Sequence, residues 1–291
     1  MTLKEAMALR HTVRKYEDEP LRKSEAGQLN ERIRLDNDAF GLSMKLVCGE
    51  EGVIGGIWKL FPAKGVCNYI ILAGEPSDRL GERVGMASAD LMLYAQTIGL
   101  NSWWVGGTYS RRKVQKQMGA EKLFGILVVG HGMTQGVPHR SKRPEQVSPE
   151  YLDSPGWFQE GVKASLLAPT AMNRQNYVIL RRGNKVKVTY GEGILSGVDQ
   201  GIVKYHFWLG AGPGNFEFED TDPQLLDAVP KSEYLFEKFY TDPHILDKPE
   251  EVPEIEEKSN FEPGKDENSG NSGEPRIQDE SETRKPSPEQ G

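Results

Sequence analysis

The sequence is poor in cysteine and lacks long apolar runs. Its 291 residues include two cysteines, Cys48 and Cys67. Two are too few for a disulfide framework, and neither belongs to a Cys-x-x-Cys pair, so both suit a reducing compartment. No run approaches the roughly 20 apolar residues that span a bilayer, and the amino terminus lacks the apolar segment of a secretory signal. We therefore expect a cytoplasmic protein that makes no use of a membrane.

Several catalytic signatures are also missing. The five histidines show no zinc-ligand spacing, and the body of the chain has no carboxylate-rich calcium loop. There is neither a P-loop nor a Gly-x-Ser-x-Gly elbow. These absences argue against a metal site and against nucleotide or serine hydrolysis, and no protein acid or base stands out.

Negative charge is concentrated in one region. The net charge is −7, and residues 247–291 carry 14 acidic and 6 basic residues, which leaves residues 1–246 nearly neutral. The carboxy-terminal segment is rich in Pro, Ser, Gly and Glu and cannot bury enough apolar surface to offset the entropy of ordering, so it is predicted to be a disordered acidic tail. The nearly neutral body gives no indication of nucleic-acid binding.

A basic segment follows the first predicted helix. Thr2 and Glu5 form a capping pair for that helix, and the chain then continues as Arg10-His-Thr12-Val-Arg14-Lys-Tyr16. Two guanidiniums and a hydroxyl within five residues can surround a phosphate with charge-assisted hydrogen bonds. The alternative for a short basic motif of this kind is a solvated turn.

This segment resembles the opening of the flavin-dependent nitroreductases. Three further stretches are similar to that family: Gly99–Thr108, with its Trp-Trp-Val-Gly-Gly; Ala168–Gln175, with Pro-Thr-x-x-Asn-x-Gln; and Gly130-His-Gly132 running to Arg140-Ser-Lys-Arg143-Pro144. The resemblance spans about residues 1–215. It implies an α+β fold with mixed sheets flanked by helices around a buried central helix.

The resemblance also implies a cofactor and its contacts. FMN would be bound at its phosphate by Arg10, Thr12, Arg14 and Arg143, with Arg140 and Lys142 as lesser candidates. Gly106 and Gly107 would lie near the reactive edge of the ring, and Pro169, Thr170 and Asn173 would approach from the opposite half. The resemblance also implies a ping-pong mechanism. In it NADH or NADPH delivers a hydride to N5 of the flavin, and a small nitroaromatic, quinone or similar acceptor then takes the electrons.

The spacing of these segments departs from the common family pattern. The Pro-Thr-x-x-Asn segment lies about 160 residues after the basic segment, where the common family has it within a few dozen. This arrangement resembles the branch in which one chain imitates the family dimer through two diverged halves. We accordingly predict halves at 1–150 and 151–246, the tail at 247–291, one flavin site per chain and a protein that can be monomeric.

The apolar pattern predicts where the main elements lie. A helix is expected over 78–98, apolar on all sides near Leu91–Ala95 and ended by Gly99. A second helix should begin at Ser154-Pro155, and a third carries Val198, Ile202 and Leu209 on one face. Only a short helix or loop is expected from Pro20 to Asp38. Strands are predicted at 42–48, 69–73 and 123–129, with a hairpin of 177–181 and 185–190 about Gly183-Asn184.

Two other functions are compatible with the same residues. The chain could hold a flavin without turnover, as a carrier or sensor, with Trp103 or Trp104 filling the substrate space. It could also be a structural remnant that binds no flavin. Rapid bleaching of the yellow protein by NADH or NADPH separates a reductase from a carrier, and a colourless protein indicates the remnant.

Overall fold

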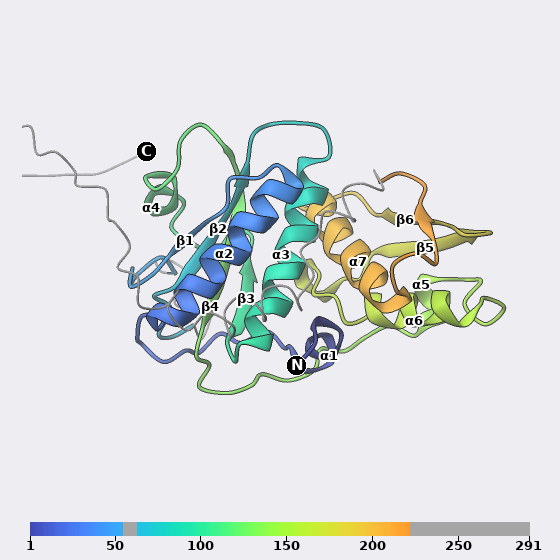
Figure 1. The fold of residues 1–291 in the computed structure, drawn as a ribbon, viewed down its shortest axis with the longest axis horizontal. Helices are drawn as coiled ribbons and strands as arrows, with labels where there is room; N and C mark the ends of the chain where they lie inside the picture. The colour runs from blue at the N-terminus through green and yellow to red at the C-terminus, as the bar shows by residue number, and fades with distance from the viewer. Residues whose placement is uncertain (55–62, 222–291) are drawn as a thin grey trace, which may run out of the picture. The chain divides into compact units, whose positions relative to one another are not determined.

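The computed structural model describes residues 1–54 and 63–221. In this part of the chain a pair of packed helices, flanked by further helices, lies between two β-sheets (Figure 1). The first sheet contains, in spatial order, β1 (Lys45–Val47), β2 (Tyr69–Gly74), β4 (Lys122–Gly130) and β3 (Asn101–Val105). All neighbouring strands in it are antiparallel. These positions confirm the strands predicted at 42–48, 69–73 and 123–129.

The first sheet is buried on both faces. Along β2, Ile70 and Leu72 face the core that includes the helices, whereas Tyr69 and Ile71 face a second cluster with Val13. A strand covered on both sides lacks the apolar-polar alternation of a half-exposed strand. The continuous apolar run of β2 therefore follows from its position.

The central helix α3 (Leu80–Thr97) confirms the strongest of the helix predictions. Every side chain from Val84 to Gln96 is buried. Gly99 follows with a φ of 84°, and the Leu100 N–H donates to the Ala95 carbonyl over 2.9 Å. The helix thus ends with the predicted left-handed glycine. The first helix, α1 (Leu3–Leu9), likewise has the predicted reciprocal cap between Thr2 and Glu5.

The expectation of a short helix or loop before Asp38 is wrong. The structure has an 18-residue helix there, α2 (Lys23–Phe40). Its inward face carries Arg32 and Asp36, both fully buried, together with Leu29 and Ile33. Because charged residues occupy core positions, the apolar periodicity that signals a long helix is interrupted.

The second half builds a smaller sheet with one buried face. It contains β5 (Tyr177–Arg182), β6 (Lys185–Tyr190) and β7 (Glu217–Phe218). The hairpin of β5 and β6 confirms the predicted turn at Gly183-Asn184, and β7 pairs in parallel with β6, so this sheet is mixed. Burial alternates along β5, with Tyr177 and Ile179 inside and Val178 and Leu180 outside.

The remaining helices cover the two sheets and form the connections. They are α4 (Arg111–Gln115), α5 (Pro144–Val147), α6 (Gly156–Ser165), the 3-10 turn η2 (Ala171–Asn173) and α7 (Ser196–Ala211). Helix α6 begins one residue later than the prediction, which had Ser154 as the N-cap and Pro155 as the first helical residue. The cap position falls on Pro155, and the Ser154 hydroxyl donates to the Glu150 carbonyl instead. No helix within residues 1–54 and 63–221 is both long and apolar enough to cross a membrane.

Helices α3 and α7 pack closely at a pair of glycines. A Cβ placed on Gly85 would lie 2.1 Å from the Val198 carbonyl oxygen, and one on Gly201 would lie 2.0 Å from that of Glu82. In each case the carbonyl belongs to the residue three positions before the other glycine: Val198 before Gly201, and Glu82 before Gly85. Two copies of one helix related by a two-fold axis produce this reciprocity. It is compatible with the predicted pseudo-dimer, which stays a prediction.

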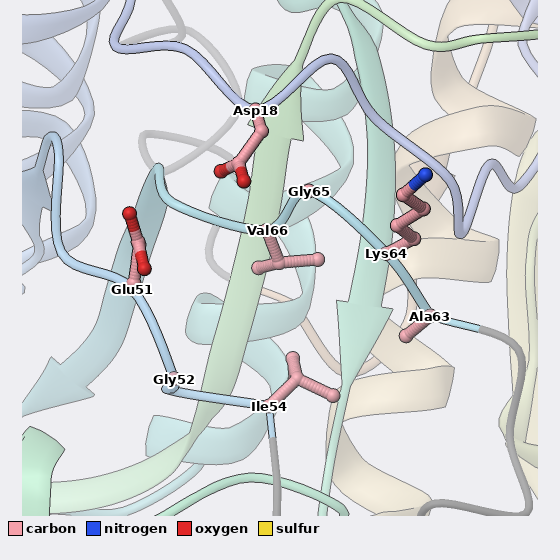
Figure 2. Close-up of a pocket in the computed structure, with 8 residues that line it drawn as sticks. All are labelled: Asp18, Glu51, Gly52, Ile54, Ala63, Lys64, Gly65 and Val66. Carbon is pink, nitrogen blue, oxygen red and sulfur yellow. The ribbon is translucent and has the colours of Figure 1, made fainter.

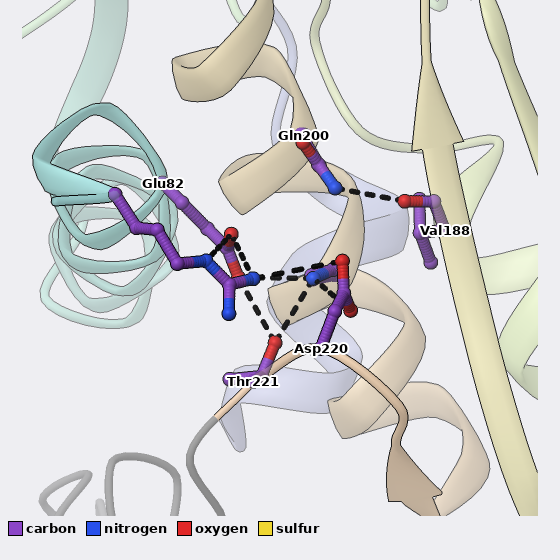
Figure 3. Close-up of polar contacts among 7 residues, drawn as sticks. Glu82, Val188, Gln200, Asp220 and Thr221 are labelled. Atoms are coloured by element: carbon purple, nitrogen blue, oxygen red, sulfur yellow. Dashed lines mark hydrogen bonds and ion pairs between the residues drawn. The ribbon is translucent and has the colours of Figure 1, made fainter.

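Two buried polar networks also join the halves. In the first, the Lys204 ammonium on α7 donates to Glu82 on α3 (3.0 Å), to Asp220 (2.7 Å) and to Thr221 (2.9 Å). Figure 3 labels these three acceptors. In the second, Arg32 donates from two nitrogens to the carboxylate of Asp90 at 2.5 Å each. The hydroxyl of Tyr205 on α7 donates to the same carboxylate.

Candidate functional site

The basic segment is held in extended form beside the first sheet. The Val13 N–H donates to the Ser102 carbonyl on β3 (3.2 Å), and the Tyr16 N–H donates to the Lys64 carbonyl (2.8 Å). On its other side the Met133 N–H donates to the Lys15 carbonyl (2.9 Å). Val13 and Tyr16 are buried in the core, whereas Arg14 and Lys15 between them are exposed.

Arg10 is a buried cation without a counter-ion. Its side chain is 4% exposed, and its Nε has no hydrogen-bond partner. Burial lowers the pKa of Arg10 to about 10, and the nearby Tyr16 opposes this only in part. No carboxylate in the described residues pairs with this guanidinium. A buried charge without a partner is costly, so this position suits an anion that the described residues do not provide.

Arg14 and Thr12 lie next to Arg10 with more access to solvent. The Arg14 guanidinium sits 5.5 Å from the centroid of the Trp103 ring, which holds its exposed side chain over β3. Thr12 is half-buried and pairs with Ser102 through the backbone. Burial, and then the charge of Arg10, lower the pKa of the intervening His11, so the histidine is neutral at pH 7. The segment therefore offers two cations and a hydroxyl.

The Gly106-Gly107 turn begins where β3 ends. A Cβ on Gly106 would lie 2.5 Å from Cδ1 of Leu195 and 3.0 Å from the ring of Trp104, so a larger residue there would displace the Leu195 side chain. Gly107 is exposed, and a Cβ there would meet nothing within 4 Å. Gly106 thus packs against the second half of the chain, while the backbone of Gly107 is open to a ligand.

The loop from Pro169 to Gln175 has an unusual backbone. Met172, Asn173 and Gln175 have φ values of 53°, 53° and 47°, in the left-handed region that residues other than glycine rarely adopt. Each such residue costs on the order of 1–3 kcal/mol and persists only where its surroundings enforce it. Strained loops of this kind are frequent at ligand sites.

The basic segment at Arg140–Arg143 holds this loop. The Asn173 amide donates to the Arg140 carbonyl (2.8 Å), and Gln175 donates to the same oxygen (3.1 Å). The Lys142 ammonium donates to the Gln175 carbonyl over 2.8 Å. Lys142 therefore has a structural role, whereas Arg143 is exposed and is the N-cap residue of α5. The amide nitrogen and oxygen of Asn173 are both bonded within the protein, the oxygen to Gln175.

Intervening residues make the contacts that connect the predicted segments to one another. Gly136, which lies in the chain between His131 and Arg140, approaches His11 so closely that a Cβ on it would be 2.9 Å from that of His11. On the opposite side, Leu195 touches Gly106, and Asp199 in the next helical turn accepts from the Ala171 N–H (3.0 Å). Within residues 1–54 and 63–221 no hydrogen bond or ion pair joins Arg14 directly to Asn173.

Among the residues that the structure describes, two of the cavities lie apart from the predicted site residues. One, of about 150 Å³, is lined by Asp18, Glu51 and the backbone near Gly65 (Figure 2). The other, of about 550 Å³, lies at the amino-terminal ends of α3 and α7 and includes Phe124, Ile194 and Leu195. None of the nine predicted site residues lines either cavity, although Leu195 connects the larger one to Gly106.

Several residues of the site were not singled out from the sequence. Gln175 is 1% exposed and bonds Thr170, Arg140 and Lys142, and its place in the Pro-Thr-x-x-Asn-x-Gln stretch was the available signal. Asp199 and Leu195 had no local signal, because their partners lie about 30 and 90 residues away in the chain. Such contacts depend on the tertiary fold.

These features define the class. The fold, with its two sheets about a central helix pair, is similar to that of a putative nitroreductase from Thermotoga maritima, at a TM-score of 0.50 and 19% identity over 72% of this chain and 83% of that one. In sequence, residues 2–211 match the family model described as "Putative TM nitroreductase". The chain belongs to that family of oxidoreductases, and its predicted α+β, nitroreductase-like fold is confirmed.

Shorter structural matches cover about half of the chain. They include an FMN-dependent nitroreductase from Clostridium difficile (TM-score 0.35, 18% identity, 44% of this chain and 87% of that one). Another is a putative nitroreductase in complex with FMN from Desulfovibrio desulfuricans (TM-score 0.38, 14% identity, 50% of this chain and 94% of that one). No curated protein sequence matches the chain significantly.

Proposed function

We propose that this protein is an FMN-dependent oxidoreductase that uses NADH or NADPH to reduce a nitroaromatic, a quinone or a similar small acceptor. The observation that carries the proposal is the buried guanidinium of Arg10, which has no counter-ion in the described residues. A phosphate monoester supplies the missing negative charge and three acceptor oxygens. Membership of the nitroreductase family supports FMN as the molecule that carries this phosphate.

The residues present fit such a cofactor. Arg10, Arg14 and the Thr12 hydroxyl would hold the phosphate with charge-assisted hydrogen bonds, and Arg143 is a further cation for the same group. The exposed backbone of Gly107 would lie against the ring, and Pro169, Thr170 and the loop that Asn173 stabilises would contact it from the second half. When bound, FMN supplies the hydride and electron chemistry, so no protein acid or base is needed for that step.

The acceptor would use the larger cleft. Its wall combines Phe124, Ile194 and Leu195 with charged side chains such as Arg79 and Lys122, and Ile194 is fully exposed. Apolar and aromatic side chains suit a flat aromatic molecule. Because Leu195 also contacts Gly106, a molecule in the cleft would lie close to the turn that borders the ring.

Comparing FMN with riboflavin tests the phosphate assignment. We expect the wild type to bind FMN more tightly than riboflavin, and Arg14→Ala to lose about tenfold to a hundredfold in FMN affinity, or roughly 1.5–3 kcal/mol. Its riboflavin affinity should not change. Arg34→Ala, which removes a 54% exposed arginine far from this segment, is the matched control. Equal FMN affinity in Arg14→Ala and the wild type would refute the assignment.

Arg10→Met provides a second test, in which FMN affinity should fall although the stability of the protein does not. Removing a buried cation that has no partner should leave the protein without FMN as stable as the wild type or more stable, because the desolvation penalty disappears. The same change should weaken FMN binding. A loss of stability without any change in FMN affinity would show that Arg10 has a structural partner and no role at the cofactor.

The carrier or sensor function is the alternative. Trp104, which lies against Gly106 and is half-buried, is the side chain best placed to restrict the site, whereas Trp103 is packed in the core beneath Arg14. Adding NADH or NADPH to the yellow protein without oxygen distinguishes the two functions. Bleaching within seconds supports the reductase, and a persistent yellow colour supports the carrier.

A further inference from the structure

Asp199 is the buried acceptor at the start of α7. Its side chain is 6% exposed. The carboxylate accepts from the Ala171 N–H at 3.0 and 3.2 Å and from the Tyr190 hydroxyl at 2.6 Å. None of the described arginines, lysines or histidines pairs with it. Its negative charge is therefore stabilised by two neutral donors alone.

The first of those donors belongs to the strained loop. Ala171 directly precedes Met172 and Asn173, whose φ values are both 53°. The far end of the loop is fixed separately, where the Gln175 N–H donates to the Thr170 hydroxyl over 3.0 Å. Asp199 thus fixes the entry to a backbone conformation that those residues would not adopt in isolation.

The same helical turn also contacts the glycine turn of the first half. The Asp199 N–H donates to the Leu195 carbonyl over 3.0 Å, and Cδ1 of Leu195 lies 2.5 Å from the position of a Cβ on Gly106. One turn of α7 therefore touches both the Gly106 turn and the Thr170–Gln175 loop. Any displacement of this turn would change the spacing between them.

We propose that Asp199 is a positioning residue that keeps the Thr170–Gln175 loop and the Gly106 turn in register for FMN, and that protonation of Asp199 weakens FMN binding. The proposal rests on the proposed function of this site. Protonation converts one carboxylate oxygen into a hydroxyl and replaces charge-assisted hydrogen bonds by neutral ones, which are about half as strong. The loop is then held less firmly.

The surroundings of Asp199 set the direction of its pH response. Burial raises the pKa of Asp199 above its ordinary value of 3.8, while the hydrogen bonds from Tyr190 and Ala171 oppose that rise. Among the described residues, the titratable group that faces it is Tyr190 on β6, and Tyr177 on β5 stacks on the Tyr190 ring while its hydroxyl donates to the Ser165 carbonyl. FMN affinity should therefore be highest when Asp199 is ionised and should fall as the pH falls through its raised pKa.

The test compares FMN dissociation constants of the wild type and Asp199→Asn from about pH 8 down to pH 4. Asparagine has the shape of the protonated acid but cannot ionise. At the alkaline end we expect Asp199→Asn to bind FMN about tenfold more weakly, as when charge assistance is lost. The two affinities should converge as the pH falls. The FMN phosphate, whose second pKa is about 6, titrates in both proteins and cancels in the ratio.

Tyr190→Phe sharpens the test. It removes the hydroxyl that lowers the pKa of Asp199, so the pH at which FMN affinity falls should move upward. Asp38→Asn is the control, since that side chain is 68% exposed on α2 and should leave the affinity unchanged. A constant ratio of wild-type to Asp199→Asn affinity at every pH would overturn the proposal, as would no shift in Tyr190→Phe.

Amide exchange separates this proposal from the proposed function. In protein without FMN, the peptide covering residues 168–176 should exchange faster in Asp199→Asn than in the wild type at about pH 8 and equally fast near pH 4, after correction for intrinsic rates. If no protein binds FMN but this difference is found, the function is wrong and the positioning role stands. If FMN binds and the exchange rates are equal, the positioning role is wrong.

Discussion

The two sheets of this protein are buried to different extents. In the first half, β2 is covered on both faces, by the helices on one side and by a second apolar cluster on the other. In the second half, β5 is covered on one face, and Val178 and Leu180 remain about 40% exposed. The first sheet is therefore a rigid support for the Gly106 turn, whereas the second depends on its contacts with α7.

The largest effect is expected where both halves share a buried charge. Arg32→Met leaves the Asp90 carboxylate buried without its cation, and such a loss typically costs about 3–5 kcal/mol. Arg34→Met removes surface pairs with Glu31 and Asp38 and should cost at most about 1 kcal/mol. Denaturant unfolding measures both. Equal effects would mean that the Arg32 network contributes no more than a surface pair.

Ile179→Ala tests whether the second sheet has a true core face. Ile179 is fully buried on β5, and its truncation should cost about 2–5 kcal/mol. Its neighbour Val178 points outward, so Val178→Thr should change the free energy of unfolding by no more than about 0.5 kcal/mol. If the two variants unfolded at the same denaturant concentration, the assignment of one buried and one exposed face to β5 would be wrong.

Gly85→Ala probes the contact between the halves. The added methyl group would meet the Val198 carbonyl, which belongs to the backbone of α7 and cannot rotate away. We expect a loss of about 1–3 kcal/mol or more, from overpacking, and a similar loss for Gly201→Ala. Gly27→Ala is the control, because a Cβ there meets nothing within 4 Å and alanine in an exposed helix position should add about 0.5–1 kcal/mol.

The smallest expected effect is the contribution of Asp36 to the pH dependence of stability. Burial and the negative charge of Asp90 raise the pKa of Asp36 well above its ordinary value of 3.8, although Arg32 opposes them. A raised folded-state pKa stabilises the protein below pH 3.8, and this contribution is lost as the pH rises toward the folded-state value. Asp36→Asn should therefore gain stability relative to the wild type as the pH increases. Thermal unfolding at several pH values checks the trend.

Local chemistry made part of this fold predictable from the sequence. The cap of Thr2 and Glu5, the Gly99 helix end and the turn at Gly183-Asn184 each depend on residues within a few positions of one another. Helix α2 was not predicted, because Arg32 and Asp36 interrupt its apolar face and because the carboxylate that pairs with Arg32, Asp90, lies on α3 more than 50 residues away. Position in the sequence does not reveal such partners.

The candidate site, like the fold, was predicted where its residues lie close together in the sequence. Arg10, Thr12 and Arg14 were identified together because they share one short segment, and their extended conformation follows from pairing with β3. Asp199 and Leu195 were missed, although they connect the segments of the site. Their importance comes from the packing of α7 and from no motif of their own.

The reciprocal packing of Gly85 and Gly201 has a consequence for how the protein responds to concentration. In an assembly of separate subunits, mass action makes a helix contact weaker at low concentration. Here α3 and α7 are covalently connected, so dilution cannot dissociate them. The contact between α3 and α7 should therefore persist at any protein concentration.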